Sequence, residues 1–319
     1  MARRTADWGL RVALLAALTA LVTTALIVHA MPPPTGPLPA AVRGTHGGRT
    51  RGHAKTRVHA TTPTAPTVPG AVFGEVTRAH AGGGCGFSLG AQAASTPVGS
   101  CTVLEIGDSL GNDLGWGLLR EVAPSSGLRL VQMDKSASGL ANSAYYDWPA
   151  HLAVYLQAYH PQLVLISLGG DDEQGMDVQG SAVEFPTTAW QNAYLDRVRQ
   201  LVGEATASGA YVLWVGLPVM GPTYYSQGIG LLNTIYQTVV TSEPNATFVS
   251  TWNLFSNPQG NFQADAVVNG SSASLREPDG IHYSYIGENV VATYVIREMA
   301  LIYHVQLAPR NPAEITGWQ

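Results

Sequence analysis

Five short apolar segments constrain the fold of this chain more than any other feature of its sequence. They are residues 102–106, 128–133, 163–168, 211–217 and 247–252. Each is a mostly continuous apolar run that is rich in branched side chains. Continuous runs of this kind form the strands of a parallel sheet, because helices cover both faces of such a sheet.

The segments between these strands are long enough for helices. Apolar residues recur at helical spacing in residues 190–208, and residues 231–240 and 286–304 fit two further helices. The sequence therefore predicts one domain of class α/β, a three-layer α/β/α sandwich of about 210 residues around a mainly parallel five-stranded sheet. In such sheets, functional sites form at the carboxyl ends of the strands. We therefore expect the chemistry in the residues that follow each strand.

The net charge of −5 conceals two parts of opposite sign. Residues 1–83 carry 9 Lys and Arg against 2 Asp and Glu, whereas residues 84–319 carry 8 basic and 20 acidic residues. The basic part precedes the predicted domain, and the acidic part contains it. An acidic domain repels the phosphate backbone, so we expect no nucleic-acid partner.

The first 30 residues are typical of a targeting segment. Arg3, Arg4 and Arg11 precede an apolar run over residues 12–28, and small or apolar residues follow where a signal peptidase cleaves. The run is at the short limit for a membrane span and slightly long for a signal-peptide core. Two interpretations of residues 1–30 therefore remain, a cleaved signal peptide and an N-terminal membrane anchor. Both predict an extracytoplasmic envelope protein, either secreted or attached to the membrane.

Residues 31–83 have the composition of a linker. They are rich in Pro, Thr, Ala, Gly and His and contain almost no large apolar side chain, so they cannot form a core. Proline favours extended conformations, which predicts a semi-flexible spacer. The basic side chains of this segment fit contact with anionic lipids or wall polymers, but a solvated tether is the interpretation that we favour. Its histidines are spaced too irregularly for a metal site.

The two cysteines, Cys85 and Cys101, lie where the predicted domain begins. In an extracytoplasmic chain, an even pair this close favours a disulfide over two free thiols. The bond would close a loop of roughly 15 residues, which is worth about 3 kcal/mol in the chain-entropy account. We place the domain at residues 84–308 and a C-terminal tail at residues 309–319.

The first predicted strand is followed by Gly107-Asp108-Ser109-Leu110 and then by a helical stretch. A serine at a strand-to-helix turn lies at a helix N-terminus, where backbone N–H groups and the helix dipole stabilise developing negative charge. That position suits a nucleophile. Asp and Ser are also favoured N-cap residues, so simple helix capping is the second interpretation.

A second motif, Pro278-Asp279-Gly280-Ile281-His282, precedes the last predicted helix. An Asp three residues before a His in a glycine-containing loop can turn its carboxylate onto the imidazole, which fixes the tautomer of the base. His282 is then the candidate general base, and Asp279 is the residue that orients it. A turn that caps the final helix explains the same residues without catalysis.

Together these motifs resemble the SGNH, or GDSL, hydrolases, a superfamily of serine esterases and acyltransferases. The stretches that match the family's blocks are, in order, GDSL, SASGLANS, SLGGDDEQ and DGIHYS. The resemblance extends from residue 102 to about residue 304 and implies a flavodoxin-like sheet. It also implies that Ser109 is the nucleophile, that His282 and Asp279 complete the triad, and that Gly139 donates its N–H to the oxyanion with Ser109. Stretches such as YYDWPAHL and WQNAYLDRV further resemble a bacterial, often membrane-tethered SGNH subgroup of unknown function.

One residue departs from the family pattern. The third block normally contains an Asn whose amide donates to the oxyanion, and Asp171 occupies that position here. An ionised carboxylate cannot donate, and the loss of one oxyanion donor typically costs about 100- to 1000-fold in rate. Three interpretations remain. Asp171 is protonated and donates, or it points away and leaves Ser109 and Gly139 to act alone, or the domain has changed from hydrolysis to binding.

Four further residues are candidates for the substrate cleft because they lie in the matched blocks or close to them in sequence. They are Asp108, Tyr145, Tyr146 and Asp172. Asp172 has a second interpretation, in which it accepts backbone hydrogen bonds and supports its loop. Asp171, Asp172 and Glu173 form an acidic cluster, but we expect no metal ion and no cofactor.

The residues and the resemblance together predict an extracytoplasmic serine esterase or O-acyltransferase that acts on small acyl esters. The expected substrates are acyl groups on glycans, such as the acetyl groups of cell-envelope glycans. The alternative is an SGNH-fold module with weak or no catalysis that binds envelope glycan or a partner protein. A lipase or thioesterase would need a long apolar groove, and residues 221–230, which could form a lid over one, are too polar to favour it.

Overall fold

The computed structural model describes residues 85–89 and 96–319. The predicted targeting segment, residues 1–30, and the predicted linker, residues 31–83, lie outside the described residues. Within the described part of the chain, no helix is both long enough and apolar enough to span a bilayer.

The central sheet confirms the predicted fold class. It contains β2 (Cys101–Gly107), β3 (Leu128–Asp134), β4 (Leu163–Ser167), β7 (Tyr211–Val215) and β8 (Ala246–Val249). All four neighbouring pairs are parallel, in the order β3-β2-β4-β7-β8. The five strands correspond to the five apolar segments of the sequence. Because the chain steps from β2 to β3 and then returns past β2 to β4, the direction of winding reverses beside β2. A reversal of this kind opens a crevice at the carboxyl ends of the strands.

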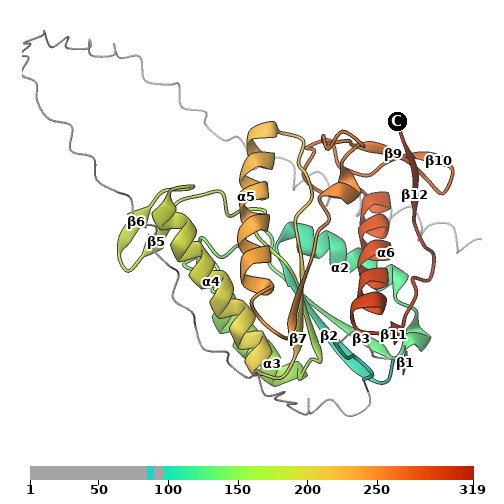
Figure 1. Ribbon diagram of the computed structural model, residues 1–319, viewed down its shortest axis with the longest axis horizontal. Coiled ribbons are helices and arrows are strands. Elements are labelled where there is room, and N and C mark those ends of the chain that lie inside the picture. The colour runs from blue at the N-terminus through green and yellow to red at the C-terminus, as the bar shows by residue number, and fades with distance from the viewer. Residues whose placement is uncertain (1–84, 90–95) are drawn as a thin grey trace, which may run out of the picture. The chain divides into compact units, whose positions relative to one another are not determined.

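Two groups of helices cover the sheet (Figure 1). The helices are α2 (Ser109–Glu121), α3 (Trp148–Tyr159), α4 (Thr188–Ala207), α5 (Thr223–Val240) and α6 (Tyr285–Ile302). Helix α2 packs on α6, whereas α4 packs on both α3 and α5. Right-handed crossovers place α2 on one face and α3, α4 and α5 on the other, because the chain reverses direction after β3. The result is the expected three-layer sandwich.

Helix α5 is longer than the sequence analysis predicts. It begins at Thr223, so most of the stretch considered as a lid is its first two turns. Pro222 precedes the helix, and the buried residues Gly228, Ile229 and Leu232 face the core. Polar residues at the start of the helix hid this part from a search for apolar periodicity.

The predicted C-terminal tail is instead part of the folded domain. Strand β12 (Ile315–Trp318) pairs antiparallel with β9 (Asp265–Val268), which also pairs with β10 (Ser271–Ser274) in a separate three-stranded sheet. A hairpin of β5 (Met176–Val178) and β6 (Ser181–Val183) follows β4. The shortest pair joins β1 (Thr96–Pro97) to β11 (Val305–Gln306) in parallel. Their few apolar residues carry too weak a pattern to identify these short strands in the sequence.

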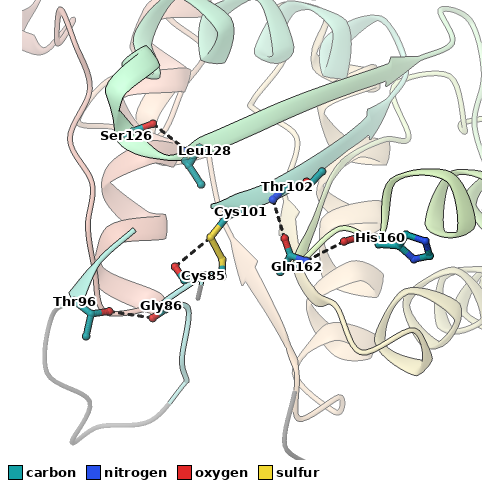
Figure 2. The surroundings of a disulfide bond; sticks show 9 residues. All are labelled: Cys85, Gly86, Thr96, Cys101, Thr102, Ser126, Leu128, His160 and Gln162. Atoms are coloured by element: carbon teal, nitrogen blue, oxygen red, sulfur yellow. Dashed lines mark hydrogen bonds between the residues drawn. A yellow bond between two sulfur atoms is a disulfide. The ribbon is translucent and has the colours of Figure 1, made fainter. Parts of the chain in front are cut away.

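The predicted disulfide between Cys85 and Cys101 is present, with a Cα–Cα distance of 5.0 Å. Figure 2 shows that it fastens the start of the described chain to the first residue of β2. Both cysteines are buried. Next to it, Gln162 accepts a hydrogen bond from the N–H of Thr102 at 2.8 Å and donates to the carbonyl of His160 at 2.9 Å. These links hold the amino ends of β2 and β4 together.

Two carboxyl groups meet beneath the first turn of α2. Glu105 in β2 is fully buried, and neither of its oxygens receives a hydrogen bond from a neutral donor among the described residues. Burial raises the pKa of Glu105 well above its usual range, and the nearby Asp134 raises it further. A proton shared between the two side chains would give one oxygen of Glu105 and one of Asp134 a hydrogen-bond partner. The native state therefore holds a proton that the unfolded chain releases above its ordinary pKa.

Replacing Glu105 with Gln is expected to stabilise the protein increasingly as the pH rises. The folded-state pKa is raised, so the stability that Glu105 contributes is present below its unfolded pKa of about 4.3 and declines as the pH rises through the folded value. A glutamine amide donates to Asp134 without titrating. The measurement is Tm from pH 4 to 9, with exposed Asp196→Asn as the control. A constant Tm difference between Glu105→Gln and wild type across that range contradicts the shared proton.

Candidate active site

The turn between β2 and α2 fixes Ser109 at the first position of the helix. Asp108 is the N-cap, and its Oδ1 accepts the N–H of Leu110 at 2.9 Å. Its Oδ2 accepts the N–H groups of Gly169 and Gly170 at 2.8 and 2.6 Å. Asp108 is fully buried, and burial raises its pKa to about 7 against the opposing effect of these N–H groups. Asp108 was predicted to line the cleft, and that prediction is wrong, because its carboxyl joins two loops below the surface.

Ser109, His282 and Asp279 form a continuous chain of hydrogen bonds. The Oγ of Ser109 lies 2.9 Å from Nε2 of His282. The other ring nitrogen, Nδ1, lies 2.7 Å from Oδ2 of Asp279. The residues come from opposite ends of the domain, separated by 173 positions. The fold thus brings together the three residues for which the sequence predicted these roles.

The loop that carries the histidine is fixed from both sides. Oδ1 of Asp279 accepts the N–H groups of Ile281 and His282 at 2.7 and 3.0 Å. Desolvation acts to raise the pKa of Asp279, but the hydrogen bonds from His282 and Ile281 outweigh it and lower the pKa. From α2, Asp113 accepts the N–H of Tyr283 at 3.1 Å. The helix that presents Ser109 therefore also anchors the base loop.

Two backbone N–H groups at the site have no protein acceptor. Among the described residues, neither the N–H of Ser109 nor that of Gly139 donates a hydrogen bond to another protein atom. Glycine is required at position 139, because an added Cβ would lie 2.0 Å from Oδ1 of Asp172. Neither N–H group is taken up by a protein acceptor, and their role as oxyanion donors stays a prediction.

Asp172 supports the glycine loop from below. It is fully buried, and its carboxylate accepts the N–H groups of Leu140 and Ala141 at 2.9 and 2.7 Å. The hydroxyl of Tyr194 donates to it at 2.6 Å and lies 2.8 Å from the hydroxyl of Tyr236. Asp172 was predicted as a cleft residue, and its burial makes that prediction wrong. Its second interpretation, as a support of the loop, agrees with these contacts.

Sequence reasoning missed a second support of the same loop. Arg197 on α4 donates to the carbonyls of Leu140 and Ala141 at 2.5 and 2.9 Å, and to the carbonyl of Asp177 at 2.5 Å. All three acceptors are main-chain groups, so nothing in the surrounding residue types pointed to this contact. The loop is therefore held through its N–H groups by one carboxylate and through its carbonyls by one guanidinium.

The profile of a family described as "Protein of unknown function (DUF459)" matches residues 102–298, which contain every residue of the triad and of the glycine loop. The chain belongs to the DUF459 family. DUF459 is a family of SGNH-like hydrolases, which confirms the resemblance found in the sequence. No match was found among curated protein sequences.

Several solved structures are similar to this DUF459 protein. A catalytic mutant of Axe2, an acetylxylan esterase from Geobacillus stearothermophilus, is 18% identical, with 66% of this chain and 99% of that chain covered and a TM-score of 0.47. TesA is 21% identical, with coverage of 62% and 97% and a TM-score of 0.42. LAE5, an α/β hydrolase from the metagenome of Lake Arreo in Spain, is 14% identical, with coverage of 64% and 97% and a TM-score of 0.46.

Asp171 lies at the site of this DUF459 protein and remains accessible to solvent. Desolvation raises the pKa of its carboxyl group, and the positive charge of a protonated His282 would lower it. Its carboxyl group makes no hydrogen bond to another described residue, although its carbonyl accepts the amide of Gln174 at 2.6 Å. Asp171 is thus an uncommitted carboxyl group within electrostatic reach of the general base.

The two tyrosines predicted for the cleft differ in their surroundings. Tyr145 is 48% exposed, and the ammonium group of Lys135 lies 5.2 Å from the centre of its ring. Tyr146 is partly buried, stacks on His151 with 3.9 Å between ring centres, and lines a cavity of about 210 Å³ together with Gly139. Tyr146 therefore shares a cavity with the glycine loop.

A buried arginine holds the base loop and was not foreseen from the sequence. The guanidinium of Arg276 donates to the carbonyl of Val219 at 3.0 Å and to the carbonyl of Ile281. It lies 5.1 to 5.6 Å from the ring centres of three aromatic side chains, those of Phe255, Phe262 and Tyr283. Arg276 is 2% exposed and forms no ion pair with a described residue. Its hydrogen bonds join the end of β7 to the loop of His282.

Replacing Arg276 with Lys is expected to lower kcat/KM for a chromogenic ester by about tenfold or more. An ammonium group keeps the charge but cannot span both carbonyls as the planar guanidinium does, so the His282 loop loses its fixed position. The measurement is steady-state hydrolysis together with Tm. Arg297→Lys, at an exposed ion pair on α6, is the matched control. Equal kcat/KM for Arg276→Lys and the control would show that Arg276 has no part in positioning the loop.

The described residues contain no group of three or more His, Cys, Asp or Glu side chains arranged to hold a metal ion. In particular, Asp172 is committed to the glycine loop and the Glu173 side chain packs against Gly228 of α5. The side chains of Asp171, Asp172 and Glu173, which are adjacent in the sequence, therefore lie in three different environments.

Proposed function

We propose that this protein is a serine esterase or O-acyltransferase that forms an acyl-enzyme on Ser109. The observation that supports this most is the hydrogen-bonded chain from Ser109 through His282 to Asp279, at 2.9 and 2.7 Å. It stands at the N-terminus of α2, where the backbone N–H of Ser109 has no protein acceptor among the described residues. That arrangement is what acyl transfer by a serine requires.

In the proposed reaction, Ser109 Oγ attacks the ester carbonyl while His282 Nε2 accepts the hydroxyl proton. Asp279 keeps the imidazole in the tautomer with its proton on Nδ1 and stabilises the imidazolium that forms. The N–H groups of Ser109 and Gly139 stabilise the oxyanion. The tetrahedral intermediate collapses, the ester C–O bond breaks, and the imidazolium returns the proton to the departing alcohol. Water or a sugar hydroxyl then releases the acyl group by the same steps in reverse.

We further propose that the protein acts outside the cytoplasmic membrane on small acyl esters, such as the acetyl groups of envelope glycans. The basic, apolar N-terminus and the Pro-rich stretch that follows it support this location. The disulfide between Cys85 and Cys101 also supports it, because such bonds persist in oxidising compartments. The N-terminal segment is the part that would contact the membrane.

The experiment that tests the proposed function is hydrolysis of a chromogenic acetyl ester by the full-length chain. A pre-steady-state burst equal to the enzyme concentration is expected, because a covalent acyl-enzyme releases the alcohol first. A serine-directed phosphonate should label the protein once, at Ser109, as located by peptide mass spectrometry. Absence of both hydrolysis and labelling would reject the proposal.

A second candidate function rests on one observation, the carboxyl group at position 171. If Asp171 is ionised beside the two oxyanion donors, it opposes the negative charge that catalysis must stabilise. A module that keeps the fold and binds glycan or a partner protein would tolerate that charge. The intact triad favours the esterase, and the substitution of Asp171 considered in the Discussion separates the two functions.

A further inference from the structure

A groove runs along α5 and begins beside the catalytic loop. One cavity of about 520 Å³ and another of about 490 Å³ are adjacent along α5, and Gly230 and Trp252 line both. The first cavity is also lined by Gly221, whose N–H donates to the carbonyl of Gly280 at 2.9 Å. Gly280 lies between Asp279 and His282. We call the two cavities together the α5 groove.

One stripe of α5 lines the α5 groove along its length. It consists of Thr223, Gln227, Gly230, Thr234 and Gln237, which recur every three or four positions on one face of the helix. The stripe spans about 21 Å at 1.5 Å per residue, which is long enough for several sugar units. An extended polymer therefore fits this surface better than a compact ligand.

The α5 groove combines aromatic surface with uncommitted amides. Trp252 lies at its centre, opposite Gly230, where an added Cβ would come within 3.7 Å of the indole ring. The side-chain amides of Gln227, Gln237 and Asn261 make no hydrogen bond to another described residue. Amides of this kind donate and accept, which matches hydroxyl groups.

The lack of charged residues in the lining limits the chemical class of ligand that the α5 groove can bind. None of the residues that line the two cavities is Asp, Glu, Lys, Arg or His. A charged polymer would lose hydration there without meeting an opposite charge. A fatty acyl chain would leave the free amides without partners. Sugar rings present apolar C–H faces to an indole and hydroxyl groups to amides, without carrying charge.

We infer that the α5 groove binds a neutral polysaccharide chain and thereby presents an acyl group on that chain to Ser109. This inference rests on the proposed function for its catalytic part and names the substrate class of that function. Trp252 stacks on one sugar ring, while Gln227 and Asn261 bond to hydroxyl groups nearer the base loop. The groove therefore gives the enzyme a preference for polymeric over small esters.

The binding test uses the full-length chain with Ser109→Ala, so that no substrate is consumed. Native electrophoresis in gels containing soluble, partly O-acetylated glucomannan measures retardation. Adding Trp252→Ala or Gln227→Ala is expected to weaken retardation by about tenfold or more for the tryptophan and less for the glutamine. Gln227 is exposed and unbonded, so its variant tests the groove even if Trp252→Ala unfolds. Trp116→Ala, at a tryptophan 51% exposed on α2, is the matched control and should bind normally.

Gels with polygalacturonate and with polyproline separate the other classes of polymer. Preferential retardation by the acidic polysaccharide or by polyproline would overturn the inference, as would equal retardation of all variants. In the wild-type background, Gln227→Ala should raise KM for the acetylated polymer, whereas the control Trp116→Ala should leave that KM and the small-ester kcat/KM unchanged. If the wild-type protein hydrolyses esters but the glucomannan gel does not retard the protein, the groove proposal is rejected and the esterase proposal stands. If the gel retards the protein in a manner that depends on Trp252, but the wild-type protein hydrolyses no ester, the esterase proposal is rejected and the groove proposal stands.

Discussion

Replacing Ser109 with alanine in the full-length chain is expected to lower kcat for a chromogenic acetyl ester by about 10³- to 10⁴-fold. Loss of the serine from a complete triad costs about 10⁶-fold in subtilisin. We expect a smaller loss here. The wild-type protein lacks the third oxyanion donor, so its rate is already about 10²- to 10³-fold lower than that of a site with all three donors. The measurement is the rate at saturating ester, with mutant Tm recorded alongside.

The control for this substitution is Ser181→Ala, at an exposed serine of the hairpin formed by β5 and β6. It removes the same hydroxyl from a position with no hydrogen bond to another described side chain, and it should keep the wild-type rate. Ser109→Ala should also lose the burst and the phosphonate label. A Ser109→Ala protein that hydrolyses the ester as fast as the control would mean that the triad is not the catalyst.

Replacing Asp171 with asparagine is expected to raise kcat by about 10- to 100-fold at neutral and alkaline pH. An amide at this position can donate to the oxyanion at every pH, and one such donor is typically worth about 100- to 1000-fold. We expect the lower range, because the side chain at position 171 has no hydrogen-bond partner among the described residues to orient the amide. Since desolvation raises the pKa of Asp171, its carboxyl group can donate only below that raised value.

The gain should therefore depend on pH. Below the raised pKa, Asp171 is protonated and donates as asparagine does, so the two proteins should have similar rates. Above it, the wild-type carboxylate repels the oxyanion, and the ratio of rates should rise to its plateau. The measurement is kcat from pH 4 to 9 for both proteins, with Asp196→Asn on α4 as the control for loss of one negative charge. No gain at any pH would favour the binding module.

The fold was predictable because burial on two faces leaves a strong pattern. The strand at 163–168 contains hardly anything but apolar residues, and the structure places β4 there with every residue buried. The short strands β9, β10 and β12 were not found, because they are half exposed and only four residues long. Their pairing depends on residues 309–319 returning to the domain, and no local pattern encodes that return.

The triad was predictable because its members lie in two compact motifs. Ser109 follows a strand, and Asp279 precedes His282 by three positions, so each motif carries a local signal. The wrong assignments concern Asp108 and Asp172. An Asp beside a nucleophile has the same signature in sequence whether its carboxylate faces the cleft or accepts buried N–H groups. For Asp108, only the positions of Gly169 and Gly170, whose N–H groups donate to its carboxylate, show that the side chain is buried and does not face the cleft.

By itself, the sequence determined the order of strands and helices along the chain, the two motifs of the triad and the substitution at Asp171. These features depend on local periodicity and on residues within a few positions of each other. The tertiary structure alone decided that Arg276 holds the base loop and that Arg197 holds the glycine loop. It also decided that the polar stripe of α5 faces Trp252 in one groove. These contacts join backbone carbonyls and side chains distant in sequence, and a carbonyl oxygen is present at every residue whatever its type.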